Sequence, residues 1–194
     1  MLLGLLFLVC LISVPLAGGR LTALAHVRLV RPWLAMAGIG LQVLIISVVP
    51  TGPAGMHELA HVASYGLFGA FAWANRRVPG VPVIALGGLL NLVAIAANGG
   101  VMPADPALAL HEARDGTGRF VNSGAIEDAR LLFLGDVLAT PESWPLRNVY
   151  SIGDAVIVLG VLVLLHRVCG SRLGGRRRVP EPASGGLQVQ RARG

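Results

Sequence analysis

The sequence has no lysine, only two cysteines and few charged residues. All 16 basic residues are arginines, and charged residues make up 13% of the 194-residue chain. Hydrophobic residues reach 54%, which is more than an ordinary soluble domain contains. The two cysteines, Cys10 and Cys169, lie near opposite ends of the chain. Their separation excludes a disulfide framework and a CxxC metal site.

The net charge of +6 does not indicate a nucleic-acid partner. The arginines gather between and after apolar runs and do not form one broad basic face. The sequence also lacks a phosphate-binding loop, a dinucleotide-binding fingerprint, a serine-nucleophile elbow and a haem attachment motif. We therefore expect no nucleic-acid partner, and we set these enzyme classes aside.

Five apolar runs of about 16 to 18 residues have nearly the length that a lipid bilayer demands. They cover residues 2–17, 32–49, 57–74, 81–97 and 149–166. Only helices satisfy all their backbone groups in such a segment. The sequence predicts an all-α fold, an integral membrane bundle of about five transmembrane helices. Gly66, Ala70 and Ala74 predict a close contact between the third helix and a neighbour.

The arginines also orient the predicted bundle, because short cytoplasmic loops retain them. Links 18–31 and 75–80 carry arginines, whereas link 50–56 carries no charge. The long link 98–148 has four arginines against seven acidic residues, and the chain after residue 166 has seven arginines against Glu181. We expect an outside N-terminus and a cytoplasmic C-terminus in a bacterial plasma membrane. The lipid bilayer would be the main partner, with other membrane proteins as further partners.

The chain divides into two predicted parts. Residues 1–169 form the bundle, and link 98–148 forms an ordered cap on its outer side. The apolar stretch 131–134 would dip into the membrane interface. Residues 170–194 are rich in Gly, Pro, Ser and Arg, and we expect a disordered cytoplasmic tail because they offer too little apolar surface to offset the entropy of ordering.

The sharpest chemical pattern is His57-Glu58-Leu59-Ala60-His61, which matches the H-E-x-x-H zinc motif. On a helix, His57 and His61 share one face and can bind one Zn²⁺, while Glu58 can act as general base toward a metal-bound water. A third ligand is needed. The candidates are Asp154, Asp136, His111 and Glu112, and none has diagnostic spacing.

The zinc motif has a competing explanation as ordinary polar residues at the membrane boundary. Intramembrane zinc peptidases of the site-2 type also carry an Asn-x-x-Pro run and a Leu-Asp-Gly run. Here Asn98 and Pro103 are too far apart, and Leu134-Gly135-Asp136 has a different order. These departures favour the structural explanation.

A second candidate site follows from polar residues within the apolar runs. Gln42, Asn91 and Asp154 lie there, and an ionisable group such as Asp154 is costly inside a membrane and is a functional candidate for that reason. We predict a pocket between the third, fourth and fifth helices, covered by the long link. Alternatively, Ser151 and Asp154 cap the start of the fifth helix.

Two sequence runs bracket the long link. They are Asn98-Gly99-Gly100-Val101-Met102-Pro103 and Ser151-Ile152-Gly153-Asp154, accompanied by Gly18-Gly19-Arg20, Asn75-Arg76-Arg77 and Phe133-Leu134-Gly135-Asp136. In these runs the chain resembles a family of uncharacterised bacterial membrane proteins. The resemblance spans nearly everything before the tail. It implies a small multi-helix inner-membrane protein of unknown function, and it brings no catalytic residue or cofactor.

The sequence therefore favours a non-enzymatic binding, transport-accessory or assembly role without a cofactor. The predicted binding residues are Asp154, Asn98, Asp136 and Ser151. The alternative is a zinc hydrolase that uses the H-E-x-x-H motif. A third interpretation is a small permease whose path is lined by the polar residues within the apolar runs.

Overall fold

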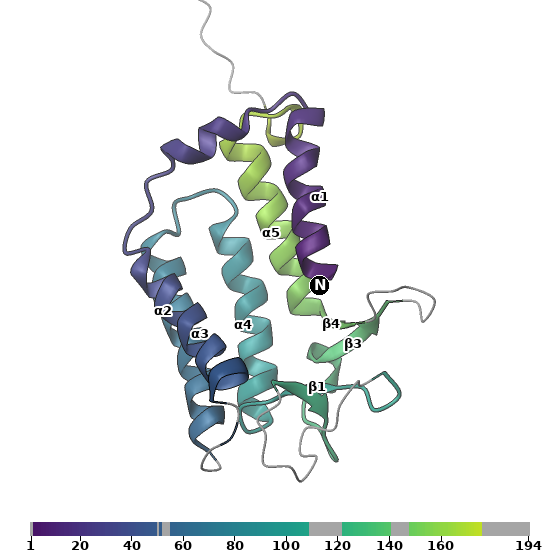
Figure 1. The fold of residues 1–194 in the computed structure, drawn as a ribbon. Coiled ribbons are helices and arrows are strands. Elements are labelled where there is room, and N and C mark those ends of the chain that lie inside the picture. Colours follow the sequence, from purple (N-terminus) through teal and green to yellow (C-terminus); the bar gives the residue numbers. More distant parts are fainter. Residues whose placement is uncertain (1, 50, 52–54, 109–121, 141–147, 176–194) are drawn as a thin grey trace, which may run out of the picture.

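The α-helices of the described residues lie in a row, with a small sheet at one end (Figure 1). This computed structural model describes residues 2–49, 51, 55–108, 122–140 and 148–175. The helices are α1 (Leu2–Leu16), α2 (Trp33–Val43), α3 (Met56–Ala74), α4 (Val81–Ala97) and α5 (Ile152–Val168). Short helical turns cover Leu21–His26, Leu44–Val48, Leu132–Leu134 and Arg172–Gly174. α2 packs on α3, α3 on α4, α4 on α5, and α5 on α1.

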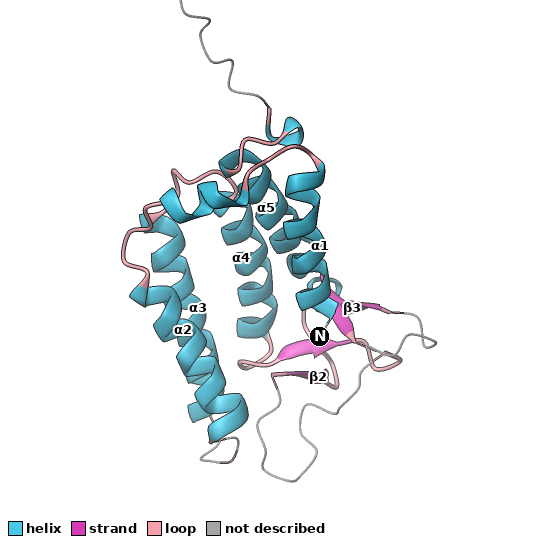
Figure 2. Cartoon of the chain, turned by 45° about the horizontal axis from the view of Figure 1, so that its top comes forward, coloured by secondary structure: helices cyan, strands magenta, loops and turns pink. Residues whose placement is uncertain are grey.

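The sheet has four short strands, seen below the helices in Figure 2. They are β1 (Met102–Ala104), β2 (Ser123–Ala125), β3 (Asp136–Ala139) and β4 (Val149–Ser151), in the order β2-β1-β3-β4. β1 is parallel to both β2 and β3, whereas β3 and β4 are antiparallel. The register pairs Asp136 with Ala104 on one side and with Ser151 on the other. Because β4 runs directly into α5, the sheet is fixed to the start of that helix.

The prediction of an all-α, five-span membrane bundle is wrong. The described residues include a four-stranded mixed sheet, and none of their helices combines the length and hydropathy of a membrane crossing. α1, α2, α4 and α5 have 15, 11, 17 and 17 residues, below the roughly 20 that a bilayer requires. α3 has 19 residues but contains His57, Glu58 and His61. The predicted orientation rested on these spans and falls with them.

The prediction of membrane spans failed because hydropathy reports apolar composition and does not show where a helix ends. Run 32–49 divides into α2 and a π-helical turn, and run 149–166 begins as a strand. The long link, in which the sequence indicated no strand, contributes β1, β2 and β3. Strands of three or four residues are too short for the alternating pattern that betrays a strand.

Some predictions are not tested by the described residues. Only 170–175 of the predicted tail fall within them. The division into two parts, the location in a bacterial plasma membrane and the lipid and protein partners stay predictions. In stretch 131–134, Leu134 packs against the buried Ala94 and Ile95, whereas Phe133 is 62% exposed.

Four glycines bring the backbones of α4 and α5 together. Gly80 and Gly87 face α5, while Gly153 and Gly160 face α4. A Cβ on Gly87 would lie 2.5 Å from the carbonyl oxygen of Gly153 and 2.8 Å from the backbone nitrogen of Ile157. Real Cβ atoms do not approach backbone so closely, so this contact requires glycine.

Within the described part of the chain, α3 does not form the predicted small-residue contact. Gly66 and Ala70 are exposed, and Ala74 is half-buried. A Cβ on Gly66 would meet nothing within 4 Å. The spacing of small residues was therefore a poor guide to the helix pair that packs most closely.

Two asparagines connect helix ends to distant segments. Asn75 ends α3 and accepts a hydrogen bond from the Val30 N–H at 2.8 Å, while its amide donates to the Val30 carbonyl at 2.9 Å. Asn98 ends α4 and accepts a hydrogen bond from the Arg130 N–H at 2.8 Å, while its amide donates to the Arg130 carbonyl at 2.7 Å. The Asn98 amide also donates to the Ala94 carbonyl at 2.7 Å. Each side chain thus imitates a strand partner for one residue.

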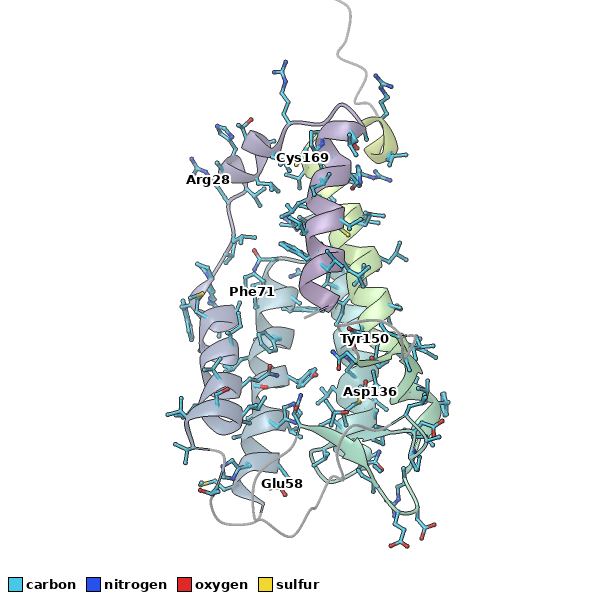
Figure 3. The ribbon with its side chains drawn as sticks, turned by 45° about the vertical axis from the view of Figure 1, so that its right-hand side comes forward. Arg28, Glu58, Phe71, Asp136, Tyr150 and Cys169 are labelled. Atoms are coloured by element: carbon cyan, nitrogen blue, oxygen red, sulfur yellow. The ribbon has the colours of Figure 1, made fainter. Side chains whose placement is uncertain are left out.

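Charged residues separate toward the two ends of the molecule. The segments at the end opposite the sheet, 17–32, 75–80 and 167–175, contain seven arginines and no acidic residue. The segments at the sheet end, 55–58, 98–108, 122–140 and 148–154, contain the six acidic residues of the described part of the chain, together with Arg130. Figure 3 shows this separation for Arg28 at one end and Glu58 and Asp136 toward the other. The electrostatic potential near the sheet is therefore negative relative to the opposite end.

We predict that Gly87→Ala destabilises the protein, because its Cβ would collide with the backbone of α5. Such overpacking costs about 1–3 kcal/mol, against a gain of up to about 1 kcal/mol when alanine replaces glycine in a helix. The matched control is Gly88→Ala, since a Cβ at Gly88 would meet nothing within 4 Å. Thermal unfolding followed by circular dichroism measures both variants. Equal Tm values would contradict the close contact.

Candidate functional site

A cavity of about 340 Å³ lies where α3, α4 and α5 meet the sheet. Its polar lining includes His61 and Tyr65 from α3, Asn91 from α4, Ser123 and Asp136 from the strands, and Asp154 from α5. Figure 3 shows Asp136 at the level where the strands approach the helices. Side chains far apart in the sequence therefore share one partly open cavity.

Asn91 joins α4 to the start of α5 within this cavity. Its amide nitrogen donates to the Asp154 carboxylate at 2.9 Å, and its amide oxygen accepts from the Ser151 hydroxyl at 2.8 Å. A Cβ on Gly153 would overlap the Asn91 amide oxygen. The close approach of α4 and α5 is thus a condition for this network.

Asp154 both caps α5 and lines the cavity. Its backbone N–H donates to the Ser151 hydroxyl at 2.9 Å, and its carboxylate accepts from the Ser151 N–H at 3.3 Å. This reciprocal pair is a capping box, which satisfies two free donors at the helix start. The predicted cap and the predicted pocket position are therefore compatible.

Asp136 is the second carboxylate of the cavity. It begins β3, is only 7% exposed and accepts a hydrogen bond from the Ser123 hydroxyl. Burial raises the pKa of Asp136 to about 6, the Ser123 bond opposes this shift, and the negative charge of Asp154 adds to it. Asp136 consequently changes its charge in mildly acidic solution.

His61 and Tyr65 add no charge at neutral pH. Nδ1 of His61 lies 2.7 Å from the Gly100 carbonyl oxygen, so this nitrogen carries the proton. Burial lowers the pKa of His61, although the Gly100 bond opposes the shift. Burial, Asp154 and Asp136 raise the pKa of Tyr65 to about 12. The carboxylates therefore set the charge of this part of the lining.

Two of the H-E-x-x-H residues bond backbone groups of the segment before α3. Nε2 of His57 lies 2.6 Å from the Val49 carbonyl oxygen, and the Glu58 carboxylate accepts from the Gly55 N–H at 2.8 Å. In the part of the chain that the structure describes, no group of three or more His, Cys, Asp or Glu side chains could hold a metal ion. The candidate ligands His111 and Glu112 lie outside the described residues. Zinc binding stays a prediction.

The four predicted binding residues occupy different positions. Asp136 and Asp154 line the cavity, and Ser151 is fully buried beside them and bonds Asn91. Asn98 is not among the lining residues, and its amide bonds Arg130 and Ala94. The structure thus brings three of the four together, and their role in binding stays a prediction.

Several lining residues escaped sequence analysis. Tyr65, Asn122, Ser123 and Asn148 line the cavity but belong to no recognisable motif. Ser123 meets Asp136 only because both β2 and β3 pair with β1. Nothing in the spacing of the sequence could indicate that pairing.

Comparison with known proteins gives a family but no activity. An uncharacterized protein of Thermotoga maritima is 32% identical over 98 residues, which is 50% of this chain and 56% of that protein. The matched region thus spans about half the length of this relative. No solved structure matches the chain.

The match to a family model is more extensive. A family of unknown function, DUF5317, matches residues 26–166. The matched region includes α2, α3, α4, the sheet and most of α5. The resemblance to an uncharacterised family is confirmed at this level, whereas its membrane character is not. The chain belongs to the DUF5317 family of unknown function.

Proposed function

We propose that the chain binds a small polar molecule in the cavity between α3, α4, α5 and the sheet. The strongest support is the convergence of polar side chains from separate helices and strands on one cavity of about 340 Å³. Small-molecule sites have volumes of roughly 300–1,000 Å³ and a few well-placed polar groups. A titratable group with a strongly shifted pKa, here Asp136, is also typical of functional sites.

The lining is held in place before any ligand arrives. Asn91, Ser151 and Asp154 form a closed set of hydrogen bonds at the junction of α4 and α5. Ser123 similarly fixes Asp136 across the sheet. Side chains that are already ordered lose little entropy when a ligand binds. This preorganisation supports recognition of a defined molecule.

The two serines of the site hold other side chains of the lining in place. The Ser123 hydroxyl donates to the Asp136 carboxylate, and the Ser151 hydroxyl donates to the Asn91 amide oxygen. Both hydroxyls therefore stabilise the lining.

We predict that a blocked cavity loses ligand binding. A thermal-shift screen of small amines, polyols and carboxylates should reveal compounds that raise the Tm, because a ligand that binds only the folded state stabilises it. Val149 lines the cavity, and Val149→Trp should abolish the shift.

The matched control for the blocked variant is Leu138→Trp on β3. Leu138 is 47% exposed and is not among the lining residues, so this variant should retain the ligand-induced shift. Circular dichroism of both variants without ligand verifies that they fold. If no compound of any charge class shifts the Tm of the wild-type protein, the proposal is wrong.

We predict that Asp136→Asn stabilises the protein above pH 6. The pKa of Asp136 is about 6 in the folded state, against about 3.9 in an unfolded chain. Between these values the folded state binds more protons, so stability falls as pH rises through this window, by up to about 3 kcal/mol. Asparagine can still accept the Ser123 bond but carries no buried charge.

The free energy of unfolding of this variant, measured with urea at several pH values, should exceed that of wild type by about 1–3 kcal/mol at neutral pH and match it near pH 4. Asp128→Asn is the control, because Asp128 is exposed and asparagine tolerates its positive φ of 54°. Identical pH profiles for Asp136→Asn and wild type would contradict the buried charge.

A further inference from the structure

The cavity has an unbalanced charge. Two carboxylates, Asp136 and Asp154, are among the described residues that line it, and no described arginine is. The sequence contains no lysine, so the arginines are the only permanent side-chain cations that the chain possesses. The two other titratable lining residues, His61 and Tyr65, are neutral at neutral pH. Buried charges without an opposite partner are costly.

We infer that the ligand of this cavity is a small organic cation, an ammonium compound held between Asp136 and Asp154. The inference rests on the proposed binding function and names the chemical class of the ligand. An ammonium group supplies a positive charge opposite the two carboxylates, which the described part of the lining does not provide. Its N–H groups or polarised methyl groups suit carboxylate oxygens. An anion would face two like charges.

The remaining lining fits the same class of ligand. Tyr65 lines the cavity together with the carboxylates. Aromatic rings attract ammonium groups through their negative faces. Side-chain amides such as those of Asn122 and Asn148 can bind a hydroxyl or a second amino group at the other end of the ligand. The cavity therefore offers a charged part and a neutral polar part.

The charge distribution of the whole molecule favours approach of a cation to this end. The described acidic residues lie at the sheet end, whereas most of the described arginines lie at the opposite end. Such a field raises the local concentration of cations near the cavity and lowers that of anions. The field and the lining thus select the same sign of charge.

Binding of an ammonium compound should depend on pH through Asp136. The titratable groups that face it are Asp154 from α5 and Tyr65 and His61 from α3. Protonation of Asp136 removes one of the two negative charges, and a cation in turn favours its ionised form. Affinity should therefore rise with pH through the range in which Asp136 ionises.

The test compares cations with neutral molecules of the same shape by isothermal titration calorimetry. The pairs are choline with 3,3-dimethylbutan-1-ol and putrescine with butane-1,4-diol. At about pH 7.5, at least one cation should bind about tenfold or more tightly than its neutral counterpart, and its affinity should fall about tenfold near pH 5. Asp136→Asn should lose both the preference and the pH dependence, while Asp128→Asn keeps them.

The outcomes separate this inference from the proposed function. Equal or tighter binding of the neutral counterparts, or binding of carboxylates alone in the thermal-shift screen, overturns the inference and leaves a binding cavity for another class of ligand. Failure of every probe to bind wild type overturns both. A cation preference that persists unchanged in Asp136→Asn, with the variant folded as judged by its Tm, removes Asp136 from the site.

Discussion

Contact between the backbones of α4 and α5 determines where the polar groups of the cavity can meet. Glycines at 87 and 153 let the helices approach until Asn91 reaches both Ser151 and Asp154. A larger residue at either glycine would separate the donors from the acceptors. The same contact fixes the direction in which β4 leaves the sheet, because Ser151 ends the strand and caps the helix. Packing and recognition are therefore consequences of one interface.

The sequence predicted the positions of the helices better than the environment and the sheet that surround them. Runs 57–74 and 81–97 nearly coincide with α3 and α4, because long apolar stretches bounded by glycine, proline and asparagine carry a strong local signal. The step from apolar runs to membrane spans failed, since it took composition as a measure of helix length. The sheet was missed for the opposite reason. Its strands are too short to show an alternating sequence pattern, and only their pairing with neighbouring strands defines them.

The candidate site was predictable only where a residue stood out from its surroundings. Asn91 and Asp154 are polar positions within apolar runs, and that contrast indicated them. Ser123 and Tyr65 belong to the cavity through tertiary contacts that have no local signature. The H-E-x-x-H motif was visible in the sequence, whereas the bonds of His57 to the Val49 carbonyl and of Glu58 to the Gly55 N–H were not. Zinc binding by this motif stays a prediction.

The side chain of Asn98, which connects the end of α4 to Arg130, is also open to chemical modification. Gly99 follows Asn98, and asparagine before glycine is prone to deamidation, in which the backbone nitrogen of the next residue attacks the side-chain amide. The hydrogen bonds to Arg130 and Ala94 restrain that amide while the protein is folded. Conversion to aspartate would replace the donor by an acceptor, and the new carboxylate would face two carbonyl oxygens. Ageing of the protein would then begin by releasing the segment before β3 from the end of α4.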